Sequence, residues 1–338
     1  MTSPVYSALY SPHGGPSGPS AAMTVPPRAT MPARRLPCRR PLALALLVAM
    51  AAVAASAQGV FRASVDVVTL HVTVADPQGR FITDLSQEQF TVLENGVRQD
   101  VNFFSRENLP VALSLLIDTS ASMESRMPIA QDAAVGFANR IRPQDLAQII
   151  DFDNRVTVAQ GFTADKALLE QAIRGTQSGG MTSMYTAVYV ALRELDRLKA
   201  QSREDVHRNA IVVLSDGEDT TSLIKFEDVL DQAKRAETVI YTIGLQPSDG
   251  INLGGFREAA YVLRQLAQET GGKAFFVQRA EELPAIYTQI AEELSNQYSM
   301  GFASNNPRRD GSWRRLQVQV ARPNTTVRTR RGYFAPSR

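Results

Sequence analysis

Three oxygen-bearing side chains follow a short apolar segment in the middle of the chain. Residues Val111 to Ile117 are mostly apolar, and Asp118, Ser120 and Ser122 come directly afterwards at alternate positions. A carboxylate with two hydroxyls is a ligand set for a hard cation, whereas softer metals prefer thiolate or imidazole ligands. The segment therefore predicts a buried strand that delivers half of a metal site at its carboxyl end.

Two further polar side chains are expected to complete this site. Asp216 follows an apolar strand predicted for residues 210–214, and Thr182 follows a flexible Gly-Gly pair. In a doubly wound sheet, the first strand and the strand after the second long helix commonly lie side by side, so Asp118 and Asp216 would face one crevice. Two carboxylates and three hydroxyls provide about five oxygens. Mg²⁺ prefers octahedral coordination, which would leave a position for a carboxylate from another molecule.

An isolated D-x-S-x-S pattern also has a simpler interpretation. Asp and Ser are common helix N-caps and turn residues, so the same side chains could form a site that binds no metal. Two nearby acids, Glu218 and Asp219, are interpreted as a solvated loop, although either could support the ligands through hydrogen bonds. Asp151 and Asp153 are interpreted as turn residues.

Strands and helices alternate between residues 108 and 296. This alternation predicts an α/β domain with a doubly wound, mostly parallel, Rossmann-like sheet and helices on both faces. The one expected hairpin turns at Asp153-Asn154. The predicted strands are 111–117, 148–152, 156–160, 210–214, 239–244 and 273–277, and the predicted helices lie around 129–141, 168–173, 188–195, 229–233, 263–270 and 281–296.

Both flanks of this domain show the two-residue period of β-strands. In residues 58–107, the apolar residues of segment 68–74 alternate with polar ones, and His71 is interpreted as a surface residue. Asn95-Gly96 predicts a tight hairpin between strands 90–94 and 97–104. In residues 297–338, strands are expected at 298–303, 313–321 and 327–331. Neither flank can hold a core alone, so we expect them to pair as one small antiparallel β-sandwich module, into which the α/β domain is inserted.

The first 57 residues have a different composition. Residues 1–33 are rich in Pro, Gly, Ser and Ala, which predicts a disordered segment or a mis-assigned start. In residues 34–57, four arginines precede an apolar run that ends in Ala55-Ser56-Ala57, which predicts a secretory signal peptide cleaved after about Ala57. The alternative, a retained membrane anchor, would need a longer apolar span. We therefore expect an exported protein, periplasmic or secreted, without a transmembrane segment after cleavage.

Composition excludes several kinds of site. The single cysteine, Cys38, lies before the predicted cleavage point, so the mature protein would have no disulfide and no thiolate site. Only His71 and His207 follow the leader, which argues against zinc or histidine-based catalysis. Removing five leader arginines from 36 basic residues leaves 31 against 34 acidic residues. A slightly acidic protein is a poor candidate for nucleic-acid binding.

The five site residues resemble the metal-ion-dependent adhesion site (MIDAS) of von Willebrand factor type A (VWA) domains. That site consists of D-x-S-x-S with a later Thr and a later Asp, matched here by Asp118, Ser120, Ser122, Thr182 and Asp216. The flanking segments F-T-V-L-E-N-G-V-R-Q and R-R-G-Y-F-A-P resemble the exported bacterial subgroup that is abundant in acidobacteria. The resemblance implies a divalent cation, Mg²⁺ with Mn²⁺ or Ca²⁺ as alternatives.

Three functions are compatible with these residues. The first is a non-enzymatic module that binds an Asp or Glu of another protein through the cation, as the resemblance implies. The second is a metal-assisted hydrolase, which would need Glu218, Asp219 or Asp153 as general base because no histidine lies near the motifs. The third is an assembly scaffold of the cell envelope that binds no metal.

Overall fold

The computed structural model describes residues 66–107, 109–201, 207–246 and 253–337. The segments interpreted as a disordered start (1–33) and a signal peptide (34–57) lie outside these residues. Within the described residues, no helix combines the length and the apolar character needed to cross a membrane.

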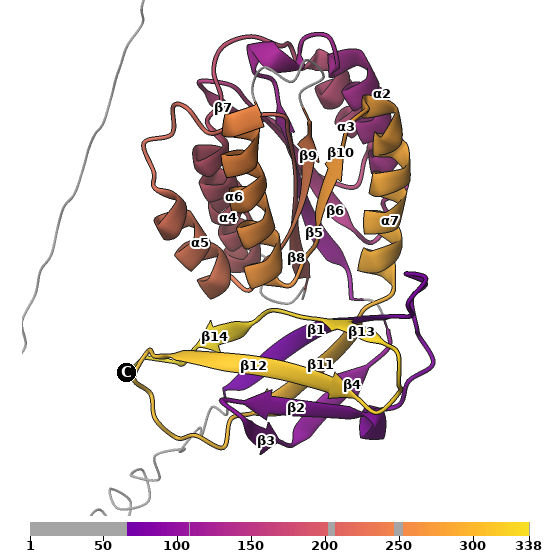
Figure 1. Ribbon diagram of the computed structural model, residues 1–338, viewed down its shortest axis with the longest axis vertical. Coiled ribbons are helices and arrows are strands. Elements are labelled where there is room, and N and C mark those ends of the chain that lie inside the picture. The colour runs from indigo at the N-terminus through magenta and orange to yellow at the C-terminus, as the bar shows by residue number, and fades with distance from the viewer. Residues whose placement is uncertain (1–65, 108, 202–206, 247–252, 338) are drawn as a thin grey trace, which may run out of the picture. The chain divides into compact units, whose positions relative to one another are not determined.

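A six-stranded sheet forms the centre of the α/β domain (Figure 1). Neighbouring strands pair in parallel except for β6 and β7, which form the expected antiparallel hairpin. The predicted doubly wound, mostly parallel fold is therefore confirmed. In spatial order the strands are β10 (Ala274–Val277), β9 (Val239–Leu245), β8 (Arg208–Ser215), β5 (Val111–Asp118), β6 (Leu146–Phe152) and β7 (Val156–Thr163).

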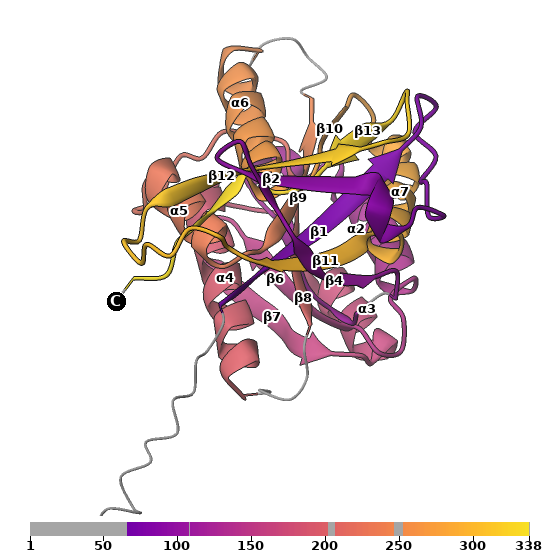
Figure 2. The ribbon, with the colours of Figure 1, turned by 90° about the horizontal axis from the view of Figure 1, so that it is seen from below.

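Helices cover both faces of this sheet, in two groups that both views separate (Figures 1 and 2). On β5, Leu113 and Leu115 pack into one core with the first group, whereas Ala112 and Leu116 pack into a second core with the other group. This explains why β5 is apolar along nearly its whole length. The first group is α2 (Met127–Ala138), α3 (Lys166–Gly175) and α7 (Leu283–Ser295), and the second is α4 (Met184–Gln201), α5 (Phe226–Arg235) and α6 (Leu253–Thr270).

The two flanking segments pair with each other in two four-stranded sheets. One sheet has the order β13-β1-β11-β4, and the other has the order β14-β12-β2-β3. Their inner faces share one apolar core. The strands are β1 (Val67–Ala75), β2 (Phe90–Glu94), β3 (Val97–Gln99), β4 (Val101–Ser105), β11 (Tyr298–Ala303), β12 (Trp313–Val320), β13 (Thr326–Arg328) and β14 (Gly332–Phe334).

Two details of the sandwich concern the predicted hairpin. Asn95 and Gly96 both have positive φ, 49° and 85°, and they join β2 to β3 as the dipeptide predicted. The single strand expected at 97–104 is wrong, because the chain leaves the sheet that contains β2 and β3 after Gln99 and enters the sheet that contains β1 and β11 as β4. The corner residue is Asp100, a type that is depleted in strands, but one such residue does not show that the chain changes sheet.

The interpretation of His71 as a surface residue is also wrong. The polar face of β1 is partly covered: His71 is half-buried, and Thr73 is buried with its hydroxyl donating to Glu293 of α7 at 3.2 Å. His71 Nδ1 lies 3.2 Å from the Ser299 hydroxyl. Burial, with Arg208 and Arg330 nearby, lowers the pKa of His71 to about 3. Alternation shows which residues share a face, but it does not show whether another part of the chain covers that face.

Glu293, which is almost fully buried, joins the α/β domain to the sandwich. Its carboxylate accepts hydrogen bonds from Thr73 of β1 and from the Tyr241 hydroxyl of β9, the latter at 2.9 Å, and it forms an ion pair with Arg328 of β13. A buried carboxylate is stable only with such partners. The end of α7 is thereby tied to strands from both parts of the sandwich.

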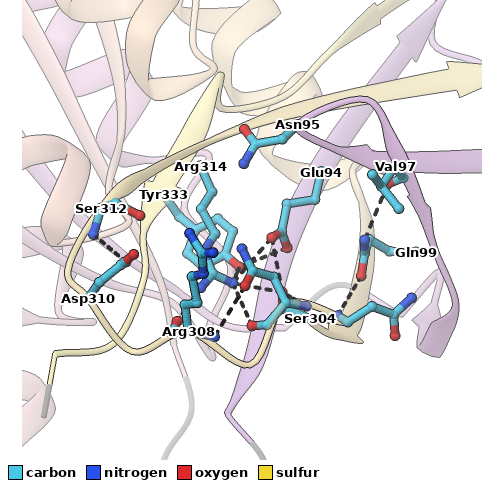
Figure 3. A network of polar contacts seen from close by, with 12 residues as sticks. Glu94, Asn95, Val97, Gln99, Ser304, Arg308, Asp310, Ser312, Arg314 and Tyr333 are labelled. Atoms are coloured by element: carbon cyan, nitrogen blue, oxygen red, sulfur yellow. Dashed lines mark hydrogen bonds and ion pairs between the residues drawn. The ribbon is translucent and has the colours of Figure 1, made fainter.

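A second buried ion pair lies inside the sandwich (Figure 3). Arg314 of β12 and Glu94 of β2 are both nearly inaccessible and lie 3.2 Å apart. The Glu94 carboxylate also accepts from Ser304 at 3.0 Å and from the Tyr333 hydroxyl at 2.9 Å. One acid from the amino-terminal flank thus anchors three side chains from the carboxyl-terminal flank.

Replacing Arg314 by Met should destabilise the protein by about 3 kcal/mol or more, because it leaves the Glu94 carboxylate buried without its cation. The free energy of unfolding, measured by urea denaturation at pH 7, tests this. Arg315→Met is the matched control, since Arg315 is the exposed neighbour and its replacement should change stability by less than about 0.5 kcal/mol. Equal stability of the two variants would contradict the role assigned to the ion pair.

Candidate metal centre

Strands β5 and β8 lie side by side, as the sequence predicts. They pair in parallel up to Ile117 and Leu214, so both end at the same edge of the sheet. Asp118 is the last residue of β5, and Asp216 directly follows β8. The chain order changes direction between these strands, which makes this edge the topological switch point where open α/β sheets bind ligands.

Asp118 is completely buried at this edge. Its Oδ1 accepts from the backbone N–H of Ser120 at 2.9 Å, and its Oδ2 accepts from the Ser215 hydroxyl at 2.5 Å. The pKa of Asp118 is raised to about 6, mainly because the carboxyl is buried; the hydrogen bonds from Ser120 and Ser215 lower the pKa, and the nearby Asp216 adds a smaller upward effect. Two hydrogen bonds therefore hold a carboxylate that forms no ion pair within the described residues.

The two serines of the motif connect Asp118 to Asp216. Ser122 Oγ donates to Asp216 Oδ1 at 2.7 Å and lies 3.1 Å from Ser120 Oγ. Ser120 precedes a short 3₁₀ helix (Ala121–Met123), but its side chain makes no capping hydrogen bond. Helix capping, the simpler interpretation of D-x-S-x-S, therefore does not account for the Ser120 hydroxyl.

The loop that carries Thr182 is hydrogen-bonded to both other loops. The Gly179 N–H donates to the Thr119 carbonyl at 2.7 Å, and the Ala121 N–H donates to the Gly180 carbonyl at 3.1 Å. The Thr182 carbonyl accepts from the backbone of the loop after β8. Gly217 directly follows Asp216, and a Cβ added to Gly217 would lie 3.8 Å from the Thr182 hydroxyl. All five predicted residues thus lie in three connected loops.

The chemistry of these five side chains fits a hard cation. All their donor atoms are oxygens, and burial raises the pKa of Asp216 as well as that of Asp118. A cation bound between two buried carboxylates would stabilise their ionised forms. Within the described residues no three His, Cys, Asp or Glu side chains cluster, so any cation held here would take hydroxyl ligands as well.

Sequence reasoning missed Arg126. This residue precedes α2, and its Nη1 lies 3.4 Å from Asp216 Oδ2 while its Nη2 donates to the Gln246 carbonyl at 2.9 Å. A cation at a helix N-terminus is unfavourable unless an acid compensates it. An arginine four residues after Ser122 could therefore have been recognised as a neighbour of the predicted acids.

Two of the acids considered as general bases have other partners. Asp219 is partly buried, and it accepts from the Tyr185 N–H at the start of α4 and from both the N–H and the hydroxyl of Ser222. This differs from the solvated loop expected for it. Asp153 accepts from the Arg155 N–H at 2.7 Å, as a turn residue does. Both carboxylates therefore shape loops around the candidate site.

Gly180→Ala should destabilise the Thr182 loop. Gly180 has a φ of +75°, and an added Cβ would collide with the Asn154 side chain and lie 3.0 Å from Asp153 Oδ2. The unfavourable φ alone costs about 1–2 kcal/mol. Urea denaturation should show at least this loss, and adding Asn154→Ala should recover part of it by removing the side-chain collision. A Gly180→Ala protein as stable as the wild type would contradict this.

The raised pKa of Asp118 predicts a pH dependence for the protein in EDTA. Between the ordinary pKa of an aspartate, 3.8, and about 6, the native state holds a proton that the unfolded state has lost, so stability falls as pH rises through this range. The effect is on the order of 2 kcal/mol. The free energy of unfolding should be measured at pH 4.5, 6 and 7.5 for wild type and for Asp118→Asn. Wild type should lose stability relative to Asp118→Asn as the pH rises. The other titrating groups are the same in both proteins, so their contributions cancel in the difference. A pH-independent difference would contradict the raised pKa.

Comparison with known proteins identifies the family of the chain. It is 26% identical over 249 residues to a UPF0353 protein of Mycolicibacterium vanbaalenii, which covers 68% of this chain and 72% of that protein. Among solved structures it is similar to a von Willebrand factor type A protein from Catenulispora acidiphila (TM-score 0.48, 10% identity, 82% of this chain and 75% of the other). A family model, the von Willebrand factor type A domain, matches residues 113–289, more than half of the chain. The chain therefore belongs to the von Willebrand factor type A domain family.

Proposed function

We propose that the chain is an exported, non-enzymatic binding module that captures an acidic side chain of a partner protein through a divalent cation. The observation that carries the proposal is the convergence of Asp118, Ser120, Ser122, Thr182 and Asp216 at the carboxyl ends of β5 and β8. VWA domains are protein-interaction modules and are generally not enzymes, which supports the same conclusion.

Each of the five side chains has a role that follows from its surroundings. Asp118 and Asp216 would supply the negative charge, and the hydroxyls of Ser120, Ser122 and Thr182 would supply neutral oxygens. The bound cation, Mg²⁺ with Mn²⁺ or Ca²⁺ as alternatives, supplies a Lewis-acidic position for a carboxylate oxygen of the partner. Ser215, whose hydroxyl donates to Asp118, orients that carboxylate.

Apolar side chains beside the site extend the surface offered to a partner. Met181 precedes Thr182 and is 55% exposed, and Leu223 follows the loop that binds the Thr182 carbonyl and is 98% exposed. Contiguous exposed apolar surface with a polar rim is typical of protein-binding sites, and these two side chains would contribute to such a surface if a partner brings them together. We therefore propose a partner whose acidic residue is flanked by apolar side chains.

The proposed location rests on the sequence of the leader. Residues 34–57 have the basic, apolar and A-x-A parts of a signal peptide, which supports export to the periplasm or the medium. The mature chain would then consist of sandwich segments 58–107 and 297–338 around the VWA domain at 108–296. Peptide mapping of the amino terminus of the protein from its native organism tests this, since an intact leader would contradict it.

Metal binding can be tested with the purified protein alone. Isothermal titration with Mg²⁺, Mn²⁺ and Ca²⁺ should show one site, and both Asp118→Ala and Ser122→Ala should weaken it by roughly tenfold or more. Asp231→Asn removes an exposed carboxylate of α5 and should leave affinity unchanged. Wild-type protein that binds none of the three ions would overturn the metal-dependent mechanism and favour a metal-free scaffold.

Partner capture can then be tested in the envelope fraction of the native organism. Proteins retained with Mg²⁺ should be released by EDTA and should be absent when the Asp118→Ala protein is the bait. Met181→Ser should reduce retention without changing metal affinity. Full retention by a folded Asp118→Ala protein in EDTA would overturn the proposal.

A further inference from the structure

A cavity of about 440 Å³ lies at the opposite end of β8 from Asp216. Its lining comes from both halves of the molecule: His71 of β1, Arg208 at the start of β8, Glu237 before β9, Gln297 after α7 and Arg330 after β13. None of the five residues of the candidate metal centre contributes to it. The cavity is therefore separate from that centre, and its volume is in the range of sites for small molecules.

Arg208 brings a buried positive charge to this cavity. Only 4% of the residue is exposed, and its hydrogen-bond acceptors are the carbonyls of Leu109 and Leu294 and the side-chain carbonyl of Gln297, the last at 2.8 Å. All three acceptors are neutral, and within the part of the chain that the structure describes no carboxylate forms an ion pair with Arg208. Burial lowers the pKa of Arg208 to about 10, so the guanidinium stays charged at neutral pH.

Arg330 brings a second guanidinium. It is 9% exposed, and its Nη2 donates to the Thr69 carbonyl at 2.6 Å. Its Nη1 lies 2.8 Å from the half-exposed carboxylate of Glu237, but Nε and Nη1 make no hydrogen bond within the described residues. Lys199 adds a third cation at the cavity lining. Two buried guanidinium groups thus lie beside one half-exposed carboxylate, and the buried Nε of Arg330 has no acceptor within the described residues.

The low pKa of His71 is also consistent with an excess of positive charge in the cavity. Burial is the largest cause of its low pKa, about 3, and the charges of Arg208 and Arg330 are the next. The ring is therefore neutral at pH 7 and cannot neutralise either arginine. The balance of charge in the cavity would be restored by an anion.

We propose that this cavity binds a small multivalent oxyanion of the phosphate or polycarboxylate class. Guanidinium groups bind such oxyanions through paired N–H donors, and within the described residues the Nε of Arg330 makes no hydrogen bond while its Nη1 has only the ion pair with Glu237. The anion would contact β1, β8 and the segment after β13, and so would join the VWA domain to the sandwich. The cavity needs no divalent cation, so this inference does not depend on the proposed function.

Calorimetric titration of the purified protein in EDTA tests the proposal, with pyrophosphate for the phosphate class and citrate for the polycarboxylate class. At least one of the two anions should give a binding signal that a titration with NaCl of equal ionic strength does not give. Arg330→Gln should weaken that binding about tenfold or more. Arg331→Gln is the matched control, because Arg331 is the exposed next residue and pairs with Glu269. No binding of either anion, or equal binding by wild type and Arg330→Gln, would overturn the proposal.

A second measurement does not depend on whether Arg330→Gln folds. The chain has three histidines, so the ring resonances of His71 can be assigned in wild-type protein by comparison with His71→Gln. The bound anion should shift these resonances at pH 7 and raise the pKa of His71 from about 3. His71 resonances that stay unchanged at saturating pyrophosphate and citrate would overturn the proposed site.

Discussion

The parallel pairing of β5 with β8 is the constraint on which the candidate site depends. Because the two strands end at one edge, Asp118 and Asp216 lie together in a buried place, where loss of water opposes the ionisation of both and the charge of Asp216 adds to this for Asp118. The surrounding loops answer this constraint: hydroxyls of Ser122 and Ser215 donate to the two acids, and Arg126 provides a nearby positive charge. The metal ion proposed for this site would neutralise the charges of Asp118 and Asp216 directly, which the hydroxyls and Arg126 do only in part.

Strand β8 also relates the two ends of the α/β domain. It begins at the buried Arg208 and is followed by the buried Asp216, so charges of opposite sign lie at opposite ends of one strand. Hydroxyls and Arg126 lie beside the acid at one end, whereas the arginine at the other end donates only to neutral carbonyl oxygens. The apolar residues between them, Ala210 to Leu214, are buried and separate the two charges. The sites proposed at the two ends would therefore bind ligands of opposite charge independently.

Much of this arrangement could be predicted because local patterns and global fold agree. The apolar run that ends at Asp118, the alternation of strands and helices, and the Asn95-Gly96 turn each specify structure within a few residues. The errors concern features that depend on distant contacts. His71 follows a surface pattern but is covered by residues more than 200 positions away, and the partnership of Arg126 with Asp216 exists only after β5 and β8 pair. The corner between β3 and β4 is marked only by Asp100, which does not reveal that the two strands belong to different sheets.

The insertion of the VWA domain between two halves of a sandwich has a consequence for the order of folding. Strand β1 pairs with β11 and β13, which are made only after the whole α/β domain. During synthesis both edges of β1 therefore stay unpaired until β11 and β13 have been made, whereas the α/β domain can complete its own sheet before then. Contacts of such long sequence separation form slowly. The sandwich is the kinetic weak point of the chain, and a nascent chain that stops before Tyr298 would expose open strand edges to aggregation.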